Sequence, residues 1–382
     1  MNSSICVEQL ARLLLGRARI SKGELMPTLQ DPIRIGDWEL PNRVIMAPLT
    51  RCRSSAGRVP NDLMRQYYQQ RAGAGLIISE ATSVSPMGVG YPDTPGIWSA
   101  DQVAGWKAVT RSVHSAGGRI LLQLWHVGRV SDPIYLNGAL PIAPSPIAPD
   151  GHVSLIRPEK PFVTPRAIEL DEIPSIVAEY KRAAENAMAA GFDGVEIHGA
   201  NGYLLDQFLQ DASNHRTDEY GEPIQNRARL MLEVVEAAVS VWGPKRVGLH
   251  LNPRGNSHSM GDSHKAETFG YVAGEVGKRG IAFICARESL EEPRVGPVIR
   301  RSFGGVYVAN DSFTKKDGEK VLANGEADAV AYGRLFIANP DLPRRFALNA
   351  PVNEPDPQTF YGQFGPKGYI DYPSLEEEEQ AA

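Results

Sequence analysis

Short apolar runs with the character of buried β-strands alternate with helical patterns along most of this chain. Apolar runs of this kind are typical of parallel strands that are covered on both faces. Eight of them occur, at residues 44–47, 76–79, 120–123, 195–197, 247–250, 281–284, 306–309 and 329–332. Eight strand–helix units in one chain favour an α/β fold of the closed (β/α)8 TIM-barrel type over an open doubly wound sheet.

Helical patterns occupy many of the segments between these strands, at residues 101–115, 171–190, 224–241, 266–278 and 314–323. Asp171 and Thr314 are expected to cap two helix N-termini, and Gly191 and Gly325 stand where helices commonly end. The sequence has no Gly-x-Gly-x-x-Gly motif that opens a helix after the first strand. Its absence argues against a dinucleotide-binding Rossmann domain.

Two further segments add to the repeating pattern. Residues 33–40 alternate about a Gly36-Asp37 turn, which predicts an N-terminal hairpin that plugs the bottom of the barrel. The connection after strand three, residues 128–170, is far longer than an ordinary βα loop, and it carries eight prolines between Pro133 and Pro165. Because proline limits the entropy that is lost on ordering, we expect a structured insertion over the catalytic face.

Composition restricts the class of protein. The chain has 382 residues, a net charge of −5 and 42% hydrophobic residues, as a soluble globular protein does. The mild negative charge gives no electrostatic footprint for nucleic acid, and no apolar run approaches the length of a membrane span. Cys6, Cys52 and Cys285 fit neither a disulfide framework nor a zinc spacing. We therefore expect a cytoplasmic protein without a metal, and exposed loop positions for His258 and His264.

The ends of the chain differ from its middle. Residues 1–26 are expected to be a disordered extension, and a transit peptide is the alternative, because Arg12 interrupts the apolar region that a signal peptide needs. Residues 27–375 are expected to form a single domain. Residues 376–382, which include the run Glu376–Glu379, are expected to form a solvated acidic tail. The sequence leaves both a monomer and a homodimer open.

Three polar side chains leave the end of the fourth strand within six residues, namely His198, Asn201 and Tyr203. An imidazole and a carboxamide can donate hydrogen bonds to a carbonyl oxygen, and a phenol can deliver a proton. His198 alone would be interpreted as a core histidine, and Tyr203 alone as an aromatic residue that packs a helix. The joint position of all three at a barrel strand end, where chemistry collects in this fold, predicts activation of an α,β-unsaturated carbonyl compound.

The other strand ends carry residues that suit a flat heterocycle with a phosphate. Thr50, Gln123 and His250, with the small Ala81, offer the hydrogen-bonding edges that a flavin needs. Arg334 follows the eighth strand, and the loops after strands seven and eight form the usual phosphate site of such barrels. The alternative for Arg334 is a surface ion pair.

Longer motifs around these positions resemble the old yellow enzyme family of FMN-dependent ene-reductases, from about residue 29 to residue 375. The resemblance rests on residues 46–51, 79–82, 123–129, 198–204, 214–221, 226–229, 337–341 and 368–373, in that order and spacing. Another branch of the family has cysteine at the position of Thr50, so this chain is similar to the branch that has threonine. The resemblance implies one FMN-binding TIM barrel with an NADPH dehydrogenase type of activity.

The resemblance also implies roles for single residues. FMN would be bound tightly but not covalently, and NADPH or NADH would reduce it. The implied cofactor contacts are Pro48, Leu49, Thr50, Ala81, Gln123, His250, Ala309, Asn310, Gly333 and Arg334. His198 and Asn201 would bind the substrate carbonyl, and Tyr203 would protonate Cα. Tyr91, Trp125 and Tyr361 would shape the substrate pocket.

Two positions depart from the family pattern. The family usually has arginine in strand five where this chain has His250. An arginine there is a permanent cation beside flavin N1 and O2, whereas histidine can be neutral at pH 7, so we expect weaker FMN retention or a lower reduction potential. Residues 309–311 replace a turn that is often glycine-rich in relatives, and we expect the Asp311 carboxylate to point away from the phosphate.

These features predict an NAD(P)H-dependent reductase of small activated alkenes that works by ping-pong hydride transfer through flavin N5. Reduction of nitrate esters, nitroaromatics or quinones at the same site stays open. So does an FMN-barrel oxidase of hydroxy acids, which would need an arginine–histidine pair to bind a carboxylate. A flavin-free hydrolase or aldolase would need a metal cluster or a Schiff-base lysine, and no expected strand ends in lysine. A binding barrel without activity is the last alternative.

Overall fold

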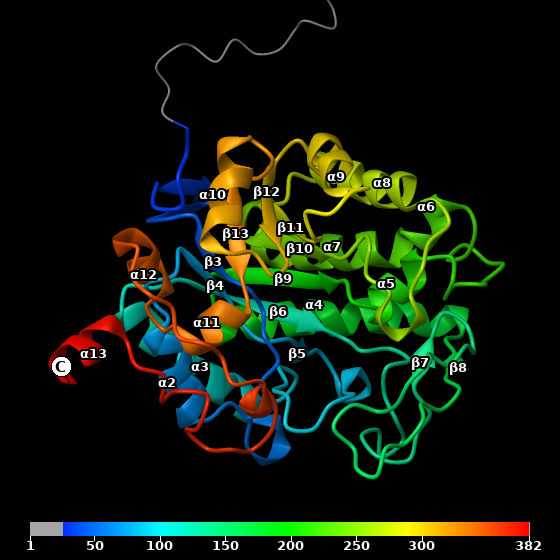
Figure 1. The fold of residues 1–382 in the computed structure, drawn as a ribbon. Coiled ribbons are helices and arrows are strands. Elements are labelled where there is room, and N and C mark those ends of the chain that lie inside the picture. Colours follow the sequence, from blue (N-terminus) through cyan, green and yellow to red (C-terminus); the bar gives the residue numbers. More distant parts are fainter. Residues whose placement is uncertain (1–25, 382) are drawn as a thin grey trace, which may run out of the picture.

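Parallel strands close into a barrel that helices surround in the computed structural model, which describes residues 26–381 (Figure 1). The expectations for residues 1–25 and 382 lie outside this range. The barrel strands are β3 (Val44–Met46), β4 (Leu76–Ile78), β6 (Ile120–Trp125), β9 (Gly194–Gly199), β10 (Val247–Leu251), β11 (Phe283–Arg287), β12 (Val306–Asn310) and β13 (Ala329–Tyr332). Neighbours in this order are paired, β4 pairs with β6, and β13 pairs with β3, which closes the ring and confirms the TIM-barrel fold.

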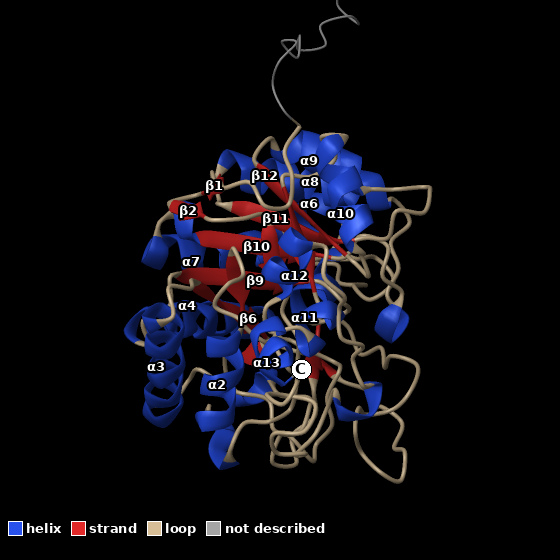
Figure 2. Ribbon diagram, turned by 60° about the vertical axis from the view of Figure 1, so that its left-hand side comes forward, coloured by secondary structure: helices blue, strands red, loops and turns tan. Residues whose placement is uncertain are grey.

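Helices lie outside the strands, as Figure 2 shows. The longer ones are α2 (Asp62–Gln70), α3 (Ala100–Ser115), α4 (Ile173–Ala189), α7 (Arg229–Trp242), α8 (Lys265–Lys278), α9 (Gly296–Phe303) and α10 (Lys315–Ala323). Shorter ones are α5 (Leu204–Leu209), α6 (Ile224–Arg227), α11 (Arg334–Ala338), α12 (Leu342–Leu348) and α13 (Leu375–Ala381). A two-residue strand, β5 (Thr82–Ser83), extends the sheet beside β6.

Seven of the eight expected strands agree with the observed ones to within two residues, and the sixth is displaced. It was expected at residues 281–284, whereas β11 covers Phe283–Arg287. Its register with β12 pairs Arg287 with Asn310, so the strand ends on a charged residue. An apolar run in the sequence cannot indicate a strand end that carries a charged residue.

Two helix expectations are wrong in detail. Asp171 does not cap α4, because it lies within a 3-10 turn, Leu170–Glu172, that precedes the helix. The segment expected at residues 224–241 is divided into α6 and α7 at Ala228. Just before the break, the buried Arg227 donates a hydrogen bond of 2.8 Å to the Leu209 carbonyl oxygen.

The expected ends of other helices are confirmed. Thr314 caps α10, where its hydroxyl accepts a hydrogen bond from the Asp317 amide. Gly191 and Gly325 have left-handed φ angles of 83° and 68° just beyond α4 and α10. These glycines therefore end their helices without the steric cost that a side chain would add.

The N-terminal hairpin is present as β1 (Ile33–Ile35) and β2 (Trp38–Leu40). Ile35, Trp38 and Leu40 belong to the buried cluster that also holds inward residues of the barrel, such as Leu121. The hairpin therefore covers one end of the barrel core. Gly36 makes its turn with a φ of 56°.

The insertion after β6 contains a parallel pair of two-residue strands, β7 (Ile142–Ala143) and β8 (Arg166–Ala167). Lys160 bridges to the buried Asp132 at 2.6 Å. Phe162 packs against a cluster that includes Trp125, at the carboxyl end of β6. The insertion is therefore structured and reaches the end of the barrel where the strands terminate.

Buried arginines join the C-terminal segment to the loops after the first strands. Arg51 donates to the Gly368 carbonyl oxygen at 2.7 Å, and Arg53 donates to that of Thr359 at 2.8 Å. The Tyr369 ring stacks on Tyr67 with centroids 4.1 Å apart. These contacts hold residues 359–369 beside the barrel mouth.

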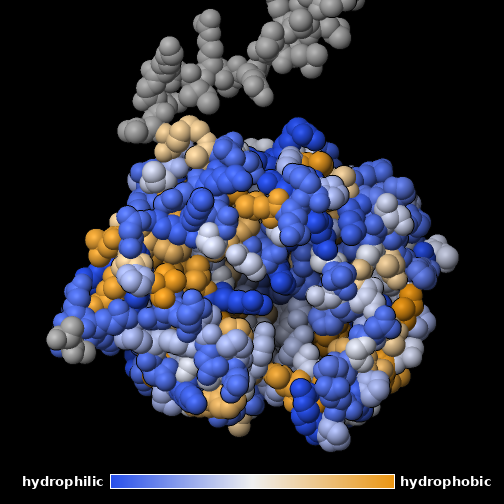
Figure 3. Space-filling model, viewed as in Figure 1, coloured by the Kyte–Doolittle hydropathy of each residue, from blue (hydrophilic) through white to orange (hydrophobic). Residues whose placement is uncertain are grey.

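The acidic run at the C-terminus lies in α13, where Glu378 accepts a hydrogen bond from Arg345 at 2.8 Å. Hydrophilic residues cover much of the face seen in Figure 3, and hydrophobic residues appear there in several separate groups. Within residues 26–381, no helix is both long and apolar enough to cross a membrane.

Replacing Gly36 by alanine should destabilise the protein through two effects. A left-handed φ costs an alanine about 1 kcal/mol, and the added Cβ would also meet the Lys245 carbonyl oxygen. Gly325→Ala is the matched control, because its φ is also left-handed but nothing lies within 4 Å of its Cβ position. In denaturant unfolding, Gly36→Ala should lose at least about 1 kcal/mol more than the control. Equal losses would contradict the proposed packing of the turn.

Candidate active site

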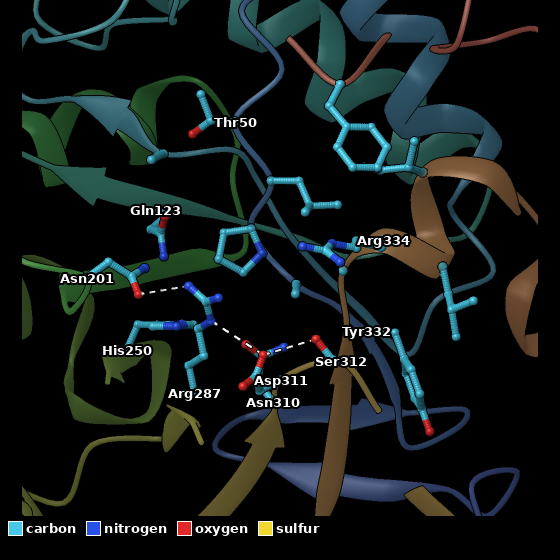
Figure 4. Close-up of a pocket in the computed structure, with 18 of the residues that line it drawn as sticks. Thr50, Gln123, Asn201, His250, Arg287, Asn310, Asp311, Ser312, Tyr332 and Arg334 are labelled. Atoms are coloured by element: carbon cyan, nitrogen blue, oxygen red, sulfur yellow. Dashed lines mark hydrogen bonds and ion pairs between the residues drawn. The ribbon is translucent and has the colours of Figure 1, made fainter. Parts of the chain in front are cut away.

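A cavity of about 640 Å³ opens at the carboxyl ends of the barrel strands (Figure 4). Every cofactor or substrate residue that the sequence proposed lines it, except one: Pro48, Leu49, Thr50, Ala81, Tyr91, Gln123, Trp125, His198, Asn201, Tyr203, His250, Asn310, Gly333, Arg334 and Tyr361. The exception is Ala309, which is buried in β12 and does not line the cavity. Arg287 at the end of β11 also lines the cavity, so residues from all eight barrel strands or their following loops meet in one place.

His198 lies within β9, and Asn201 and Tyr203 follow it in the turn that leads to α5. The side chains of His198 and Tyr203 meet edge to face, with ring centroids 5.0 Å apart. The Tyr203 hydroxyl forms a hydrogen bond of 2.9 Å with that of Tyr91. Asn201 has a φ of 57°, a left-handed conformation that asparagine tolerates better than most residues.

Burial sets the protonation states of these groups. It holds the pKa of His198 well below its ordinary value, and the neighbouring His250 acts in the same direction. Burial and the adjacent Tyr91 raise the pKa of Tyr203 well above its ordinary value. His198 is therefore a neutral imidazole with one N–H donor, and Tyr203 keeps its phenolic proton.

A buried polar group lies at the floor of the cavity. Gln123 donates from Nε2 to Glu196 at 2.8 Å, and the other oxygen of Glu196 lies 3.6 Å from His250 Nδ1. Because a carboxylate only accepts, the Gln123 carbonyl oxygen is turned away from Glu196. Among the described residues, His250 Nδ1 has no hydrogen-bond partner. This edge therefore offers an acceptor at Gln123 and a titratable ring at His250.

Glu196, His250 and Cys285 also place one possible metal ligand each within 4.8 Å of one another. Burial raises the pKa of the Cys285 thiol well above its ordinary value, which disfavours the thiolate that binds metals. The expectation of no metal stays a prediction.

At the opposite end of the cavity, Gly333 precedes α11 and Arg334 begins it. Arg334 is exposed to the cavity and makes no ion pair among residues 26–381, which disfavours its alternative as a surface ion-pair residue. The Asn310 side chain is used internally, because its Nδ2 donates to the Ala331 carbonyl oxygen at 2.8 Å. This hydrogen bond uses one of the two N–H donors of the Asn310 amide.

Asp311 follows Asn310 at the end of the cavity where Arg334 lies, and its backbone φ is unusual, at 131°. Its carboxylate lies 3.7 Å from Arg287 Nε and accepts a hydrogen bond of 3.2 Å from the Ser312 hydroxyl. Figure 4 shows this chain of contacts across the cavity mouth. Arg287 offsets the negative charge of Asp311, and the direction of the carboxylate relative to a phosphate stays a prediction.

Sequence reasoning gave no role to several residues of this region, and two of them, His258 and Asn252, contact Asn201. His258 was expected in an exposed loop, but it lines the cavity, and its Nδ1 lies 2.9 Å from the Asn201 carbonyl oxygen. Asn252 follows β10 directly and donates to the Asn201 side chain at 2.7 Å. Its position two residues after His250 was a usable signal, because strand ends meet in this fold. The contact of His258 depends on the path of a long loop, which no local pattern gives.

The cavity suits FMN on several observations. Its volume is within the range of about 300–1,000 Å³ that small-molecule sites have. Pro48, Leu49 and Ala81 offer an apolar wall, and Gln123 offers a polar edge with a free acceptor. Arg334 offers a cation at the far end. A planar ring with a polar edge and a phosphate matches this distribution.

Comparisons with known proteins agree with this fit. The NADH:flavin oxidoreductase / NADH oxidase family matches residues 28–353. A putative 12-oxophytodienoate reductase 2 of Oryza sativa subsp. japonica is 45% identical over 93% of this chain and 96% of its own length. The 12-oxophytodienoate reductase 2 of Arabidopsis thaliana is 43% identical over 91% of this chain and 96% of its own.

Two solved structures are similar to this chain in both fold and sequence over most of its length. The old yellow enzyme homologue from Zymomonas mobilis superposes with a TM-score of 0.89 at 44% identity, over 91% of this chain and 100% of its own. Morphinone reductase in complex with tetrahydroNAD superposes with a TM-score of 0.88 at 48% identity, over 91% of this chain and 98% of its own.

Replacing His250 by arginine should tighten FMN binding and raise the reduction potential, because it adds a permanent cation at the expected flavin edge. A hydrogen bond to a charged group contributes about 1.5–3 kcal/mol, so the FMN dissociation constant should fall roughly tenfold or more. Equilibrium dialysis and a spectroscopic redox titration measure the two effects. His264→Arg, at an exposed position, is the control for added charge. Unchanged affinity and potential in His250→Arg would show that His250 does not act at the flavin edge.

Proposed function

Because this chain belongs to the NADH:flavin oxidoreductase / NADH oxidase family, which includes the old yellow enzymes, we propose that it reduces the C=C bond of α,β-unsaturated carbonyl compounds. NADH or NADPH would supply the electrons. The observation that carries the proposal is the meeting of His198, Asn201 and Tyr203 in one cavity that also fits FMN. The named relatives support it, since their names refer to the reduction of 12-oxophytodienoate and of morphinone.

FMN, when bound, supplies the two-electron chemistry that connects a nicotinamide to an alkene. Thr50, Gln123 and His250 would hold its polar edges, and Arg334 its phosphate, with the main chain of Asn310 and Gly333. Both half-reactions would use the same cavity, so ping-pong kinetics follow.

His198 and Asn201 would hold the substrate by its carbonyl oxygen. Both can donate a hydrogen bond as neutral groups, and negative charge on that oxygen grows as the alkene accepts hydride at Cβ. Donors that are already in place stabilise this charge without reorganisation, which is the principle of an oxyanion hole. The clamp therefore favours the enolate-like transition state over the ground state.

Tyr203 would complete the reaction by giving its phenolic proton to Cα. Its raised pKa keeps the proton on the oxygen throughout the neutral range. The overall reaction is balanced, because one hydride from the nicotinamide and one proton from Tyr203 saturate the double bond, and water restores the proton. Tyr91, whose hydroxyl contacts that of Tyr203, is placed to take part in this restoration.

An anaerobic titration tests the proposed function directly. The purified holoprotein should show a flavin spectrum that NADH or NADPH bleaches, and addition of 2-cyclohexen-1-one should restore it with formation of cyclohexanone. A protein that is bleached but is reoxidised only by a nitrate ester, a nitroaromatic or a quinone would support the alternative on the same site. Bleaching by a hydroxy acid would support an oxidase, and a colourless protein that binds no FMN would contradict all three.

The variant Tyr203→Phe should slow reoxidation by an enone and spare flavin reduction. General acid catalysis contributes about 10²–10⁴-fold, so the oxidative half-reaction should lose at least 100-fold. Anaerobic stopped-flow absorbance separates the two halves. Tyr271→Phe, on the outer helix α8, is the control and should leave both unchanged. Equal slowing of both halves in Tyr203→Phe would remove Tyr203 from the role of proton donor.

The lowered pKa of His198 predicts that its imidazole stays neutral at pH 6, below the ordinary histidine pKa of about 6.5. An NMR titration measures this, with the His198 signal assigned by its loss in His198→Gln. The unfolded chain binds a proton at His198 near pH 6.5 while the folded chain does not. This residue should therefore reduce the free energy of unfolding as pH falls below about 6.5. Protonation of folded His198 at its ordinary pKa would contradict the account.

A further inference from the structure

We propose that Asn252 and Arg287 are positioning residues that fix the side-chain amide of Asn201 with its Nδ2 group turned toward the substrate carbonyl. The inference rests on the proposed function and deepens it. A side-chain amide can present either its oxygen or its NH2 group to the cavity, and the inference explains why Asn201 presents the NH2 group. Neither positioning residue belongs to the motifs on which the resemblance rests. Both act from strand ends on the same side of β9, since Asn252 follows β10, which pairs with β9, and Arg287 ends β11, the next strand beyond β10.

Two donors converge on one oxygen of Asn201. Its Oδ1 accepts a hydrogen bond from Asn252 Nδ2 at 2.7 Å and a second from Arg287 Nη1 at 3.3 Å. Figure 4 shows the guanidinium of Arg287 between Asn201 and Asp311. The acceptor side of the Asn201 amide is thus occupied on the protein side, and Nδ2 is the group left for a ligand.

The orientation follows from the chemistry of the partners. A pair of asparagines alone is symmetric, because both amides can turn over together and exchange donor for acceptor. Arginine breaks this symmetry, since a guanidinium has five N–H donors and no acceptor. The Asn201 atom that faces Arg287 must therefore be oxygen, and Asn252 must present its NH2 group to the same oxygen. The opposite arrangement would place two sets of N–H groups against each other.

Both positioning residues are themselves held in place. Asn252 is buried, with 5% of its surface exposed, and a Cβ on Gly255 would collide with its amide, so the following loop packs closely on it. Arg287 is half-exposed and is joined to Asp311, whose carboxylate lies 3.7 Å from its Nε. The Asn201 main chain is fixed separately by His258, 2.9 Å from its carbonyl oxygen. Asn201 therefore has little freedom to present a different face.

The orientation of the Asn201 amide decides whether it attracts or repels the negative charge on the substrate carbonyl oxygen. An NH2 group aimed at a carbonyl oxygen stabilises the negative charge that develops there, whereas a turned amide would aim a carbonyl oxygen at it and repel it. The cationic donor at Oδ1 also polarises the amide, which strengthens its N–H groups as donors. Arg287 would thus act on the substrate through Asn201, and Asn252 would do so as well.

The variant Asn252→Asp tests the inference, because a carboxylate has nearly the same shape but can only accept. It should draw the Asn201 NH2 group to itself and turn the Oδ1 atom toward the cavity. We expect KM for 2-cyclohexen-1-one to rise and kcat for its reduction to fall, with kcat/KM lower by at least about tenfold. Asn256→Asp adds the same charge at an exposed position in the same loop and should leave kcat/KM unchanged.

A double-mutant comparison separates positioning from a general structural effect. In an Asn201→Ala background the amide is gone, so Asn252→Asp should have no further effect on kcat/KM. An equal loss in both backgrounds, or no loss in the single variant, would overturn the inference. Arg287→Met should also lower kcat/KM, and Arg287→Lys, which restores a donor-only group, should recover part of the loss. A kcat/KM for Arg287→Lys that is no higher than that for Arg287→Met would contradict the positioning role of Arg287.

A readout without catalysis keeps this test distinct from that of the proposed function. In the wild-type holoprotein, NMR hydrogen exchange should show the Asn252 NH2 group protected and the Asn201 NH2 group exchanging freely, with each assigned by its change to aspartate. The reverse pattern would overturn the inference even if the enzyme reduces enones. Absence of enone reduction with the expected exchange pattern would instead reject the proposed function and leave the amide orientation established.

Discussion

Closure of the parallel barrel is the constraint on which every feature of the site depends. The pairing of β4 with β6 and of β13 with β3 brings the carboxyl ends of all eight strands to one face. The register then decides which side chains are neighbours. His250 is level with His198 on one side and with Cys285 on the other, and Arg287 is level with Asn310. A one-residue slip in any of these pairings would turn the side chains of that strand to the other face of the sheet.

Burial at this face turns ordinary titratable groups into neutral ones. His198 loses its proton, Tyr203 keeps its own, and Asn201 cannot titrate, so the proposed carbonyl clamp works without a formal charge. Neutral donors in a site of low dielectric stabilise developing charge strongly, and they add little desolvation cost to the resting enzyme. Apart from the buried Glu196 at the floor, the charged groups lie further out, where Arg287 pairs with Asp311 and Arg334 faces the cavity. In the proposed function, proton transfer at Tyr203 would thus be separated from phosphate binding at Arg334.

Sequence reasoning recovered the barrel because each strand is apolar and each is followed by a helix, and that signal is local. Fifteen residues proposed from the sequence line the cavity, some because strand ends meet at one face in this fold and others, such as Tyr91 and Tyr361, because the family resemblance implied them. Sequence reasoning misplaced the start of β11 and the cap of α4, where tertiary pairing and a 3-10 turn override the local pattern. It missed Asn252 and His258, whose importance lies in contacts with Asn201 across 51 and 57 residues of sequence. The roles of single residues toward FMN came from resemblance and stay predictions here.

The central proposal is that hydride at Cβ and the proton from Tyr203 at Cα would reach opposite faces of one bound alkene, while His198 and Asn201 hold its carbonyl oxygen. The most direct test is reduction of 2-methyl-2-cyclohexen-1-one in ordinary water by a nicotinamide that carries deuterium at the transferred position. The account predicts a saturated ketone with deuterium at Cβ and a solvent-derived hydrogen at Cα, added on the face opposite to the deuterium, as read by NMR. Addition of both atoms to the same face, or an intact double bond with the carbonyl reduced, would contradict it.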